Sequence, residues 1–397
     1  MKSTYFSYIL TLFLMMLSAS TKAQIDEVAL TEKLEKIQKL GFLPGFAVAV
    51  LSPDGIHYQK GFGYSDLNSK KPFTIHSLQN IGSISKTLTG VALVTLIEEG
   101  KLDYDTLIND FLPFKIQNPK HHDAAITIRQ LATHTSSIVD ADAYEHTYVF
   151  QEKITIPEEK LPEDLKDYIP IYNKNIPMSL IDFIKGMMHP SGSWYSDENF
   201  LKSKPGSEYE YSNMNAAIAG YIIEQVSGKS YEEYTQEIIL NPLSMSNSGW
   251  SHEEIDSRKF VSLYLSNNEQ IPPYSLISFA DGGLITSIYD MSLFFHEMIK
   301  GYFGSDSKIL SKESFTKMMS PVYSSEEINS GMFWTINRRG LIGHTGGDPG
   351  IMTFMMFDPK TRYGRIIFTN KYDEEGDGYN QLVYIWKTLG DFINMKK

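Results

Sequence analysis

The strand-like segments of this sequence gather near its two ends, whereas residues 80–320 have mainly the pattern of helices and loops. An apolar run at 46–51, a turn at 53–55 and a second run at 56–64 predict a hairpin near the start. Further strands are predicted near the end, at 332–337, 341–344, 351–357 and 365–370. We therefore expect an α/β (α+β) fold, with one antiparallel sheet formed by both chain ends, flanking helices and a mostly helical lobe.

Two helices are expected near the chain ends, at 28–40, where apolar residues recur at helical spacing, and at about 381–393. The sheet lobe is expected at about 24–80 and 325–397, and the helical lobe at about 81–324. A cleft is predicted where the two lobes meet, and such clefts commonly hold binding sites.

The first residues have the pattern of a secretory signal peptide, with Lys2, an apolar run at 5–17 and small residues up to a cleavage site after Ala23. The apolar run is short for a membrane span, and an uncleaved anchor is the minority alternative. We expect a signal peptide at 1–23, one domain at 24–397 and a periplasmic or secreted location, with no stable membrane span after cleavage. The absence of cysteine excludes disulfides, a thiol nucleophile, zinc–thiolate sites and a lipoprotein anchor.

The formal net charge of −12 argues against nucleic acid or an anionic membrane surface as a partner. A small-molecule or peptide substrate is expected, and the oligomeric state is left open. The cluster at 121–123, two histidines and an aspartate, is better explained by a polar loop than by a metal site. We expect neither a metal nor a cofactor.

Ser83 and Lys86 lie three residues apart, directly after Gly82 and before an apolar helix predicted at 88–97. Residues at this spacing share one face of a helix, so the Lys86 amine can reach the Ser83 hydroxyl. The free N–H groups at a helix start favour negative charge developing on an attacked carbonyl oxygen. The same spacing also occurs at 305–308 and 314–317, where it is more typical of polar helix starts near the surface.

Two later motifs make the pattern specific. Tyr211-Ser212-Asn213 precedes an apolar helix at 214–226, with Ser212 as a plausible N-cap, and His344-Thr345-Gly346-Gly347 lies between strand-like runs. These motifs, in this order after Ser83 and Lys86, resemble the serine β-lactamase and penicillin-binding protein family in its class C-like branch. Further matching segments lie at 131–137, 241–245 and 281–284. The resemblance spans roughly residue 30 to the C-terminus and implies a β-lactamase/transpeptidase-like fold.

The resemblance also implies roles for these residues. Ser83 is the expected nucleophile, and Lys86 and Tyr211 are expected to share proton transfer as a coupled pair, since both have unperturbed pKa values near 10. Asn213 is expected to orient Lys86 and the acyl side chain of the substrate. The oxyanion hole is expected at the backbone N–H groups of Ser83 and Gly347, on a substrate-binding segment that also includes His344, Thr345 and Gly346.

Two features depart from the family pattern. His344 stands where many β-lactamases have lysine, which puts potent β-lactam hydrolysis in doubt, because a mostly neutral imidazole holds a carboxylate less strongly. Its charge would help an anionic substrate only below a pH of about 6.5, unless the ring merely packs in one fixed tautomer. The spacing from Ser83 to Tyr211 is also long, and the excess at 139–204 is either a plain surface excursion, which we favour, or a lid over the cleft.

The function expected from these motifs is that of an exported serine hydrolase that forms an acyl-enzyme. Its substrates would carry amide or lactam bonds, of the D-amino-acid peptide or β-lactam type, as for β-lactamases and D-alanyl-D-alanine carboxypeptidases. A carboxylesterase on the same scaffold is the first alternative. A non-catalytic, penicillin-binding-like protein is the second, although a retired site has no chemical need for Ser83, Lys86 and Tyr211 together.

Overall fold

The computed structural model describes residues 26–324 and 328–396. The expected signal peptide at 1–23 lies outside the described residues, so its cleavage stays a prediction. Within the part that the structure describes, no helix combines the length and the apolar character needed to cross a membrane. The predicted helix at 28–40 is present and spans residues 26–38.

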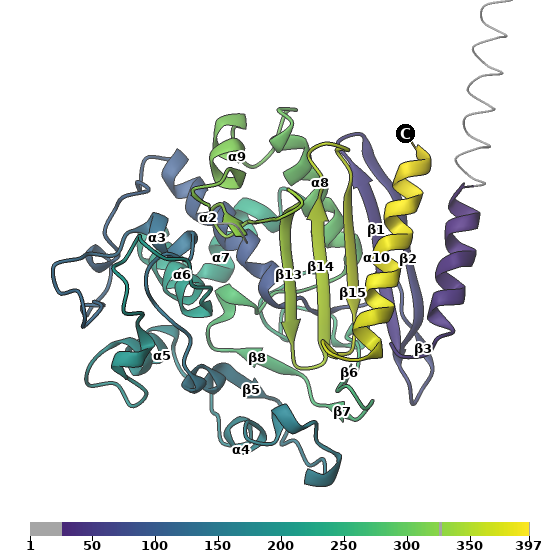
Figure 1. Cartoon of the computed structure of the whole chain (residues 1–397), viewed down its shortest axis with the longest axis horizontal. Coiled ribbons are helices and arrows are strands. Elements are labelled where there is room, and N and C mark those ends of the chain that lie inside the picture. The colour runs from purple at the N-terminus through teal and green to yellow at the C-terminus, as the bar shows by residue number, and fades with distance from the viewer. Residues whose placement is uncertain (1–25, 325–327, 397) are drawn as a thin grey trace, which may run out of the picture.

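A large antiparallel sheet joins the two ends of the chain, as the sequence predicts (Figure 1). Strand β1 (Gly45–Ser52) pairs with β15 (Gly364–Thr369) on one side and with β2 (Gly55–Asp66) on the other, with Phe46 opposite Thr369. The strand order over the described residues is β10-β11-β12-β13-β14-β15-β1-β2-β3. The other strands of this sheet are β3 (Lys71–Pro72), β10 (Tyr323–Ser324), β11 (Ile328–Ser330), β12 (Thr335–Asn337), β13 (Ile342–Asp348) and β14 (Ile351–Phe357).

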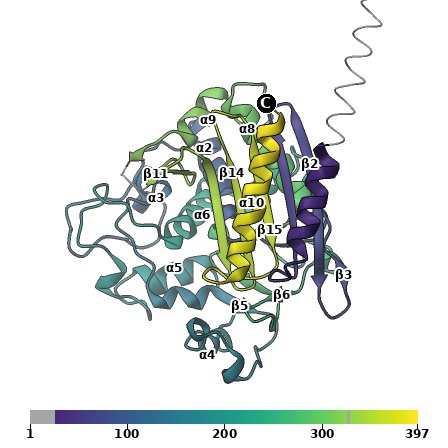
Figure 2. The same cartoon turned by 45° about the vertical axis from the view of Figure 1, so that its right-hand side comes forward.

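The sheet has a hydrophobic core on each face. All eight residues of β1 are buried, and successive side chains point to opposite faces. Val48 packs with the N-terminal helix and α10 (Asp377–Lys396), which lie on one face (Figure 2). Ala49 packs into the larger core on the other face, where α8 (Ile288–Tyr302) contacts β1 and β15. The observed helix α10 extends the predicted helix at 381–393 in both directions.

The helical part of the molecule is built around α2 (Lys86–Glu98), whose residues are buried on every side from Lys86 to Leu96. It is preceded by a 3-10 turn, η1 (Gly82–Ser85), and contacts α6 (Asn213–Ser227). The remaining α-helices of the described residues are α3 (Ile128–Ala132), α4 (Ile169–Tyr172), α5 (Leu180–Met188), α7 (Tyr231–Thr235) and α9 (Lys312–Met319). Short strand pairs also occur here: β4 (Gln79–Asn80) with β9 (Ile285–Thr286), β5 (Tyr148–Phe150) with β8 (Tyr274–Leu276), and β6 (Leu263–Tyr264) with β7 (Gln270–Ile271).

Candidate active site

Ser83 lies where the sheet meets the helical part, in the η1 turn that leads into α2. Gly82 before it has a φ of +56°, a left-handed conformation that glycine adopts without strain. A side chain at Gly82 would also place its Cβ 3.3 Å from the backbone N of Gly347 on β13. The glycine therefore lets strand β13 approach the serine closely.

The structure brings Ser83, Lys86 and Tyr211 together, although 128 residues separate Ser83 from Tyr211. The Nζ of Lys86 lies 2.9 Å from the Oγ of Ser83, and the Tyr211 hydroxyl donates a hydrogen bond to the same Oγ at 2.8 Å. Lys86 also donates to Asn213 Oδ1 at 2.6 Å and to the backbone carbonyl of Asp281 at 2.8 Å. Its Nζ is thus surrounded by three oxygen atoms.

Asn213 is held in place by the start of helix α6. Ser212 is the N-cap residue, as the sequence predicts, but its side chain does not cap the helix. Asp140 does so instead: its carboxylate accepts hydrogen bonds from the backbone N–H groups of Asn213 and Met214, at 2.6 and 3.1 Å, and from the Ser212 hydroxyl at 2.7 Å. A carboxylate at a helix N-terminus is favoured by the helix dipole.

Strand β13 supplies the other wall of the site. Gly346 packs against η1 so closely that an added Cβ would clash with Ile81 O and lie 3.1 Å from Ser83 N. Thr345 and Gly347 are exposed, whereas His344 is buried. His344 Nδ1 lies 2.6 Å from the carbonyl of Thr345, an acceptor only, so Nδ1 carries the proton and Nε2 presents its lone pair.

Burial sets the charge of the reacting groups. Desolvation lowers the pKa of Lys86, against the opposing charges of Asp281, Asp140 and Asp348. Desolvation raises the pKa of Tyr211 well above its ordinary value, while the hydrogen bond with Ser83 acts in the other direction. Burial thus favours the uncharged form of both groups, the neutral amine of Lys86 and the intact phenol of Tyr211.

Desolvation, with a smaller contribution from Lys86, lowers the pKa of His344 to about 4. The ring is therefore neutral at neutral pH, and the value of about 6.5 used for the sequence-based expectation is wrong for this buried side chain. The structure favours the alternative of a fixed, neutral tautomer.

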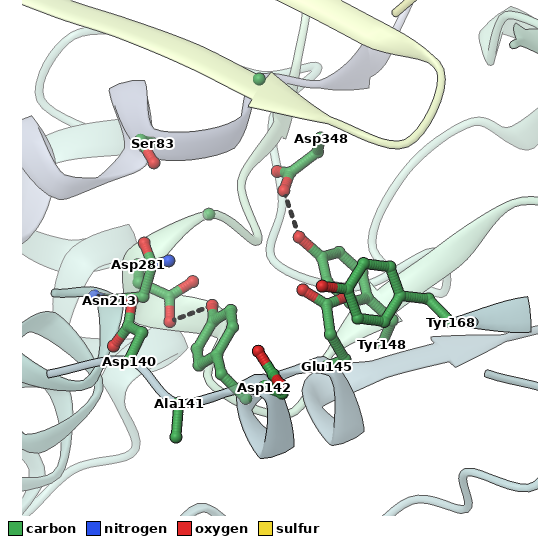
Figure 3. A pocket seen from close by; sticks show the side chains of 13 residues that line it. Ser83, Asp140, Ala141, Asp142, Glu145, Tyr148, Tyr168, Asn213, Asp281 and Asp348 are labelled. Carbon is green, nitrogen blue, oxygen red and sulfur yellow. Dashed lines mark hydrogen bonds between the residues drawn. The ribbon is translucent and has the colours of Figure 1, made fainter. Parts of the chain in front are cut away.

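A cavity of about 240 Å³ opens beside Ser83 (Figure 3). Tyr144 donates a hydrogen bond to Asp281 Oδ2 at 2.8 Å, and Tyr148 donates one to Asp348 Oδ1 at 2.6 Å. Burial raises the pKa of each of these two aspartates to about 7. The lining residues are Ser83, Asp140, Ala141, Asp142, Tyr144, Glu145, Tyr148, Tyr168, Asn213, Asp281, Gly282, Gly347 and Asp348.

A family model described as Beta-lactamase matches residues 34–389. The chain belongs to the β-lactamase family. "Protein flp" of Staphylococcus aureus strain MW2 is 26% identical over 366 residues, which are 90% of this chain but 65% of that protein, less than two thirds of its length. "Penicillin-binding protein 4*" of Bacillus subtilis strain 168 is 26% identical over 370 residues, covering 87% of this chain and 72% of the relative.

Solved structures have the same β-lactamase/transpeptidase-like fold. The octameric penicillin-binding protein homologue from Pyrococcus abyssi has a TM-score of 0.69 and 25% identity, covering 91% of this chain and 77% of its own. The D-amino acid amidase from Ochrobactrum anthropi SV3, complexed with L-phenylalanine amide, has a TM-score of 0.66 and 20% identity. The match covers 92% of this chain and 99% of the amidase chain. This second likeness extends to the fold alone.

The cavity wall contains residues that the motifs do not reveal. Asp348 directly follows the His344–Gly347 motif, and Asp140 and Tyr144 lie in the long segment at 139–204. The favoured interpretation of that segment as a plain surface excursion is wrong for part of it, because seven of its residues line the cavity: Asp140, Ala141, Asp142, Tyr144, Glu145, Tyr148 and Tyr168. The high content of tyrosine and acidic residues there was the available signal. Its movement as a lid stays a prediction.

Within residues 26–324 and 328–396, no three His, Cys, Asp or Glu side chains are grouped so that they could hold a metal ion. His121, in the polar cluster at 121–123, has its Nε2 2.8 Å from the carbonyl of Lys202.

Proposed function

We propose that this chain is a serine hydrolase that forms an acyl-enzyme on Ser83. One observation carries the proposal: the Ser83 Oγ lies 2.9 Å from a buried amine, Lys86 Nζ, and 2.8 Å from the hydroxyl of a half-buried phenol, Tyr211. A serine hydroxyl needs a base to become a nucleophile, and both neighbours are within hydrogen-bonding distance of it. Membership of the β-lactamase family supports the same chemistry.

Lys86 is the base in this proposal. A neutral amine has two N–H groups and one lone pair. Asn213 Oδ1 and the Asp281 carbonyl oxygen are acceptors only, so they take the two N–H groups. The third neighbour of Nζ is Ser83 Oγ, so the lone pair faces the serine hydroxyl. The lowered pKa of Lys86 favours this neutral form.

Tyr211 then acts as the proton donor. When Ser83 Oγ bonds to the carbonyl carbon, its proton passes to Lys86 and the C=O electrons move to the oxygen. The bond to the leaving nitrogen or oxygen breaks next, and the leaving atom takes the proton of the Tyr211 hydroxyl. Lys86 then passes the proton that it received from Ser83 to Tyr211. Water attacks the resulting ester and gives a proton to the same pair, and Ser83 Oγ regains its proton as the acyl bond breaks.

The developing oxyanion is stabilised, in this mechanism, by the backbone N–H groups of Ser83 and Gly347. Their segments pack together, since an added Cβ at Gly82 would lie 3.3 Å from Gly347 N. Removing one such donor typically costs about 2.7–4 kcal/mol of barrier. The exposed backbone of Gly347 and the side chain of Thr345 leave room for a substrate along β13.

The bonds proposed as substrates are amides, including those of D-amino-acid peptides, with lactams as the less favoured group. The fold is shared with a D-amino acid amidase and with penicillin-binding proteins, which supports the amide class. His344 is neutral and supplies no cation for the carboxylate of a β-lactam. A carboxylesterase is the second candidate, because an ester needs no such cation. We also propose that the chain is exported through the signal peptide at 1–23. The proposed sheet lobe comprises about 24–80 and 325–397, and the proposed helical lobe about 81–324.

The test is a panel of amino-acid amides, D-Ala-D-Ala peptides, nitrocefin and p-nitrophenyl esters, followed at early times. We expect turnover, with an initial burst of leaving group equivalent to the enzyme present wherever deacylation is slow. Ser83→Ala should abolish both, whereas Ser305→Ala, at a surface site, should keep them. Turnover by Ser83→Ala would contradict the proposal, and no reaction with any compound would favour a non-catalytic binding protein.

A further inference from the structure

The cavity beside Ser83 is strongly acidic. Five carboxylate side chains line it, those of Asp140, Asp142, Glu145, Asp281 and Asp348, and no lysine, arginine or histidine is among its described lining residues. Three tyrosines, Tyr144, Tyr148 and Tyr168, complete its polar wall. Carboxylates beside aromatic faces are the surroundings in which proteins bind organic cations.

Some of these carboxylates already have structural tasks. Asp140 caps helix α6 through three hydrogen bonds. Asp281 accepts from Tyr144, and its charge acts on the nearby Lys86. Glu145 accepts a hydrogen bond from Tyr172. These contacts give three of the five carboxylates a structural role without a ligand. A ligand-binding role therefore rests on the other carboxylates of the cavity.

Two carboxylates are left, Asp142 and Asp348, and only Asp348 is buried. Its side chain is only 9% exposed, and Tyr148 donates to Oδ1 at 2.6 Å. No described residue donates to Oδ2, which faces two glycines: an added Cβ would lie 2.9 Å from it at Gly82 and 3.3 Å from it at Gly282. In Figure 3 the Asp348 carboxylate points into the space between Ser83 and Glu145. A carboxylate oxygen that accepts no hydrogen bond from the described residues thus faces the cavity beside the serine.

We propose that this cavity selects substrates that carry a protonated amine next to the scissile carbonyl, with Asp348 accepting the ammonium N–H and Glu145 and the tyrosine rings completing its surroundings. The inference rests on the proposed function, because it defines the acyl group that Ser83 receives. Its chemical class is an amide or ester of an amino acid, or the end of a peptide, with a free α-amino group.

The position of Asp348 on β13 explains why the amine belongs beside the carbonyl. Asp348 directly follows Gly347, whose N–H is proposed to bind the carbonyl oxygen, and consecutive Cα atoms are about 3.8 Å apart. In an amino-acid acyl group one carbon atom separates the ammonium nitrogen from the carbonyl carbon. The two groups of the substrate therefore match two adjacent residues of the strand.

The electrostatics of the cavity agree with this occupant. Burial raises the pKa of both Asp281 and Asp348, and their mutual repulsion contributes for Asp348. A cation placed between them relieves that repulsion and favours the ionised carboxylates. A substrate carboxylate would meet the same charges and be repelled.

The experiment measures binding and does not depend on turnover. Ser83 is labelled with a fluorophosphonate, and the labelling rate is followed in the presence of either enantiomer of phenylalanine amide or of the analogue in which methyl replaces the ammonium group. We expect at least one enantiomer to protect Ser83 at concentrations about tenfold or more below those needed of the analogue. In Asp348→Asn, which keeps an acceptor for Tyr148, the ratio between the protecting concentrations of the analogue and of the amide should fall towards one. Asp391→Asn, which removes an exposed carboxylate on α10, should keep it.

The outcomes separate the two proposals. Labelling of Ser83 with equal protection by both compounds, or with protection by neither, overturns the amine preference and leaves the serine nucleophile standing. A preference that survives unchanged in Asp348→Asn also overturns it. An absence of Ser83 labelling in the folded protein contradicts the proposed function, and the inference fails with it.

Discussion

At the scale of single residues, the chemistry depends on the burial of the Lys86 amine, because the amine of an exposed lysine stays charged at neutral pH. Lys86 is fully buried, and three oxygen atoms surround its Nζ, including Ser83 Oγ. The spacing of Ser83 and Lys86 made their contact predictable, and the family resemblance pointed to Tyr211 and Asn213. The third partner, the carbonyl of Asp281, was not predictable, because any residue presents the same backbone oxygen.

Lys86→Ala and Tyr211→Phe should each lower kcat at least about 10²-fold, the lower end of typical acid–base contributions. Their double variant should lose far less than the product of the two losses, because the two groups act on the same proton of Ser83. Steady-state kinetics on one amide and one ester provide the measurement. Strictly multiplicative losses would rule out the shared-proton mechanism.

The pH dependence should report Lys86 and not His344. Because the lone pair of Lys86 is needed, kcat/KM should fall as pH decreases through its lowered pKa, and Lys86→Arg should abolish activity. Because the pKa of His344 is lowered to about 4, KM for a carboxylate-bearing substrate should show no inflection near pH 6.5. A KM that rises through pH 6.5 in the wild type, and does so no longer in His344→Gln, would show that the ring is charged.

At the scale of elements, the site depends on the close packing of β13 against η1. The alternating pattern predicted strands at 341–344 and 351–357, and the structure has β13 and β14 at these places. The pattern could not show that the glycines of β13 lie against the serine turn, since that contact joins segments more than 250 residues apart. Likewise the cap of α6 was expected from Ser212, and it comes from Asp140 in a distant loop.

Adjacent glycines on β13 offer a matched test of this packing. Gly346→Ala should lower kcat about 10²-fold or more, because its Cβ would clash with Ile81 O and push the strand away from Ser83. Gly347→Ala should be tolerated within about tenfold, because its Cβ would approach only the side chains of Tyr372 and Glu374, at 3.2 Å. Thermal unfolding checks that both variants fold. Equal activity of the two variants would contradict the packing argument.

At the scale of the whole molecule, the sequence predicted a sheet built from both chain ends, and β1 does lie between β2 and β15. The prediction succeeded because β1 is apolar from Phe46 to Leu51, as is typical of a strand buried on both faces. The acidic wall of the cavity could not be predicted in the same way. Its carboxylates come from β13, from the start of 139–204 and from Asp281, and only the tertiary fold places them together.

This acidic cavity should reduce the stability of the protein without ligand. The pKa of Asp348 is about 7 in the folded state and about 3.9 in the unfolded chain, so stability falls as pH rises from about 4 to about 7. Asp348→Asn should therefore raise the free energy of unfolding at pH 8, by up to about 4 kcal/mol, and leave it nearly unchanged at pH 4. Denaturant unfolding at both values is the measurement, with Asp391→Asn as the control. A loss of stability at pH 8 would contradict this account.

The central claim is that Ser83 becomes acylated, and locating a covalent adduct tests it most directly. The folded protein is treated with a fluorophosphonate, digested, and the modified peptide is identified by mass spectrometry. We predict a single modified site at Ser83, lost in Ser83→Ala and strongly slowed in Lys86→Ala. An adduct at Ser305 or Ser314, or one that persists in Ser83→Ala, would contradict the account.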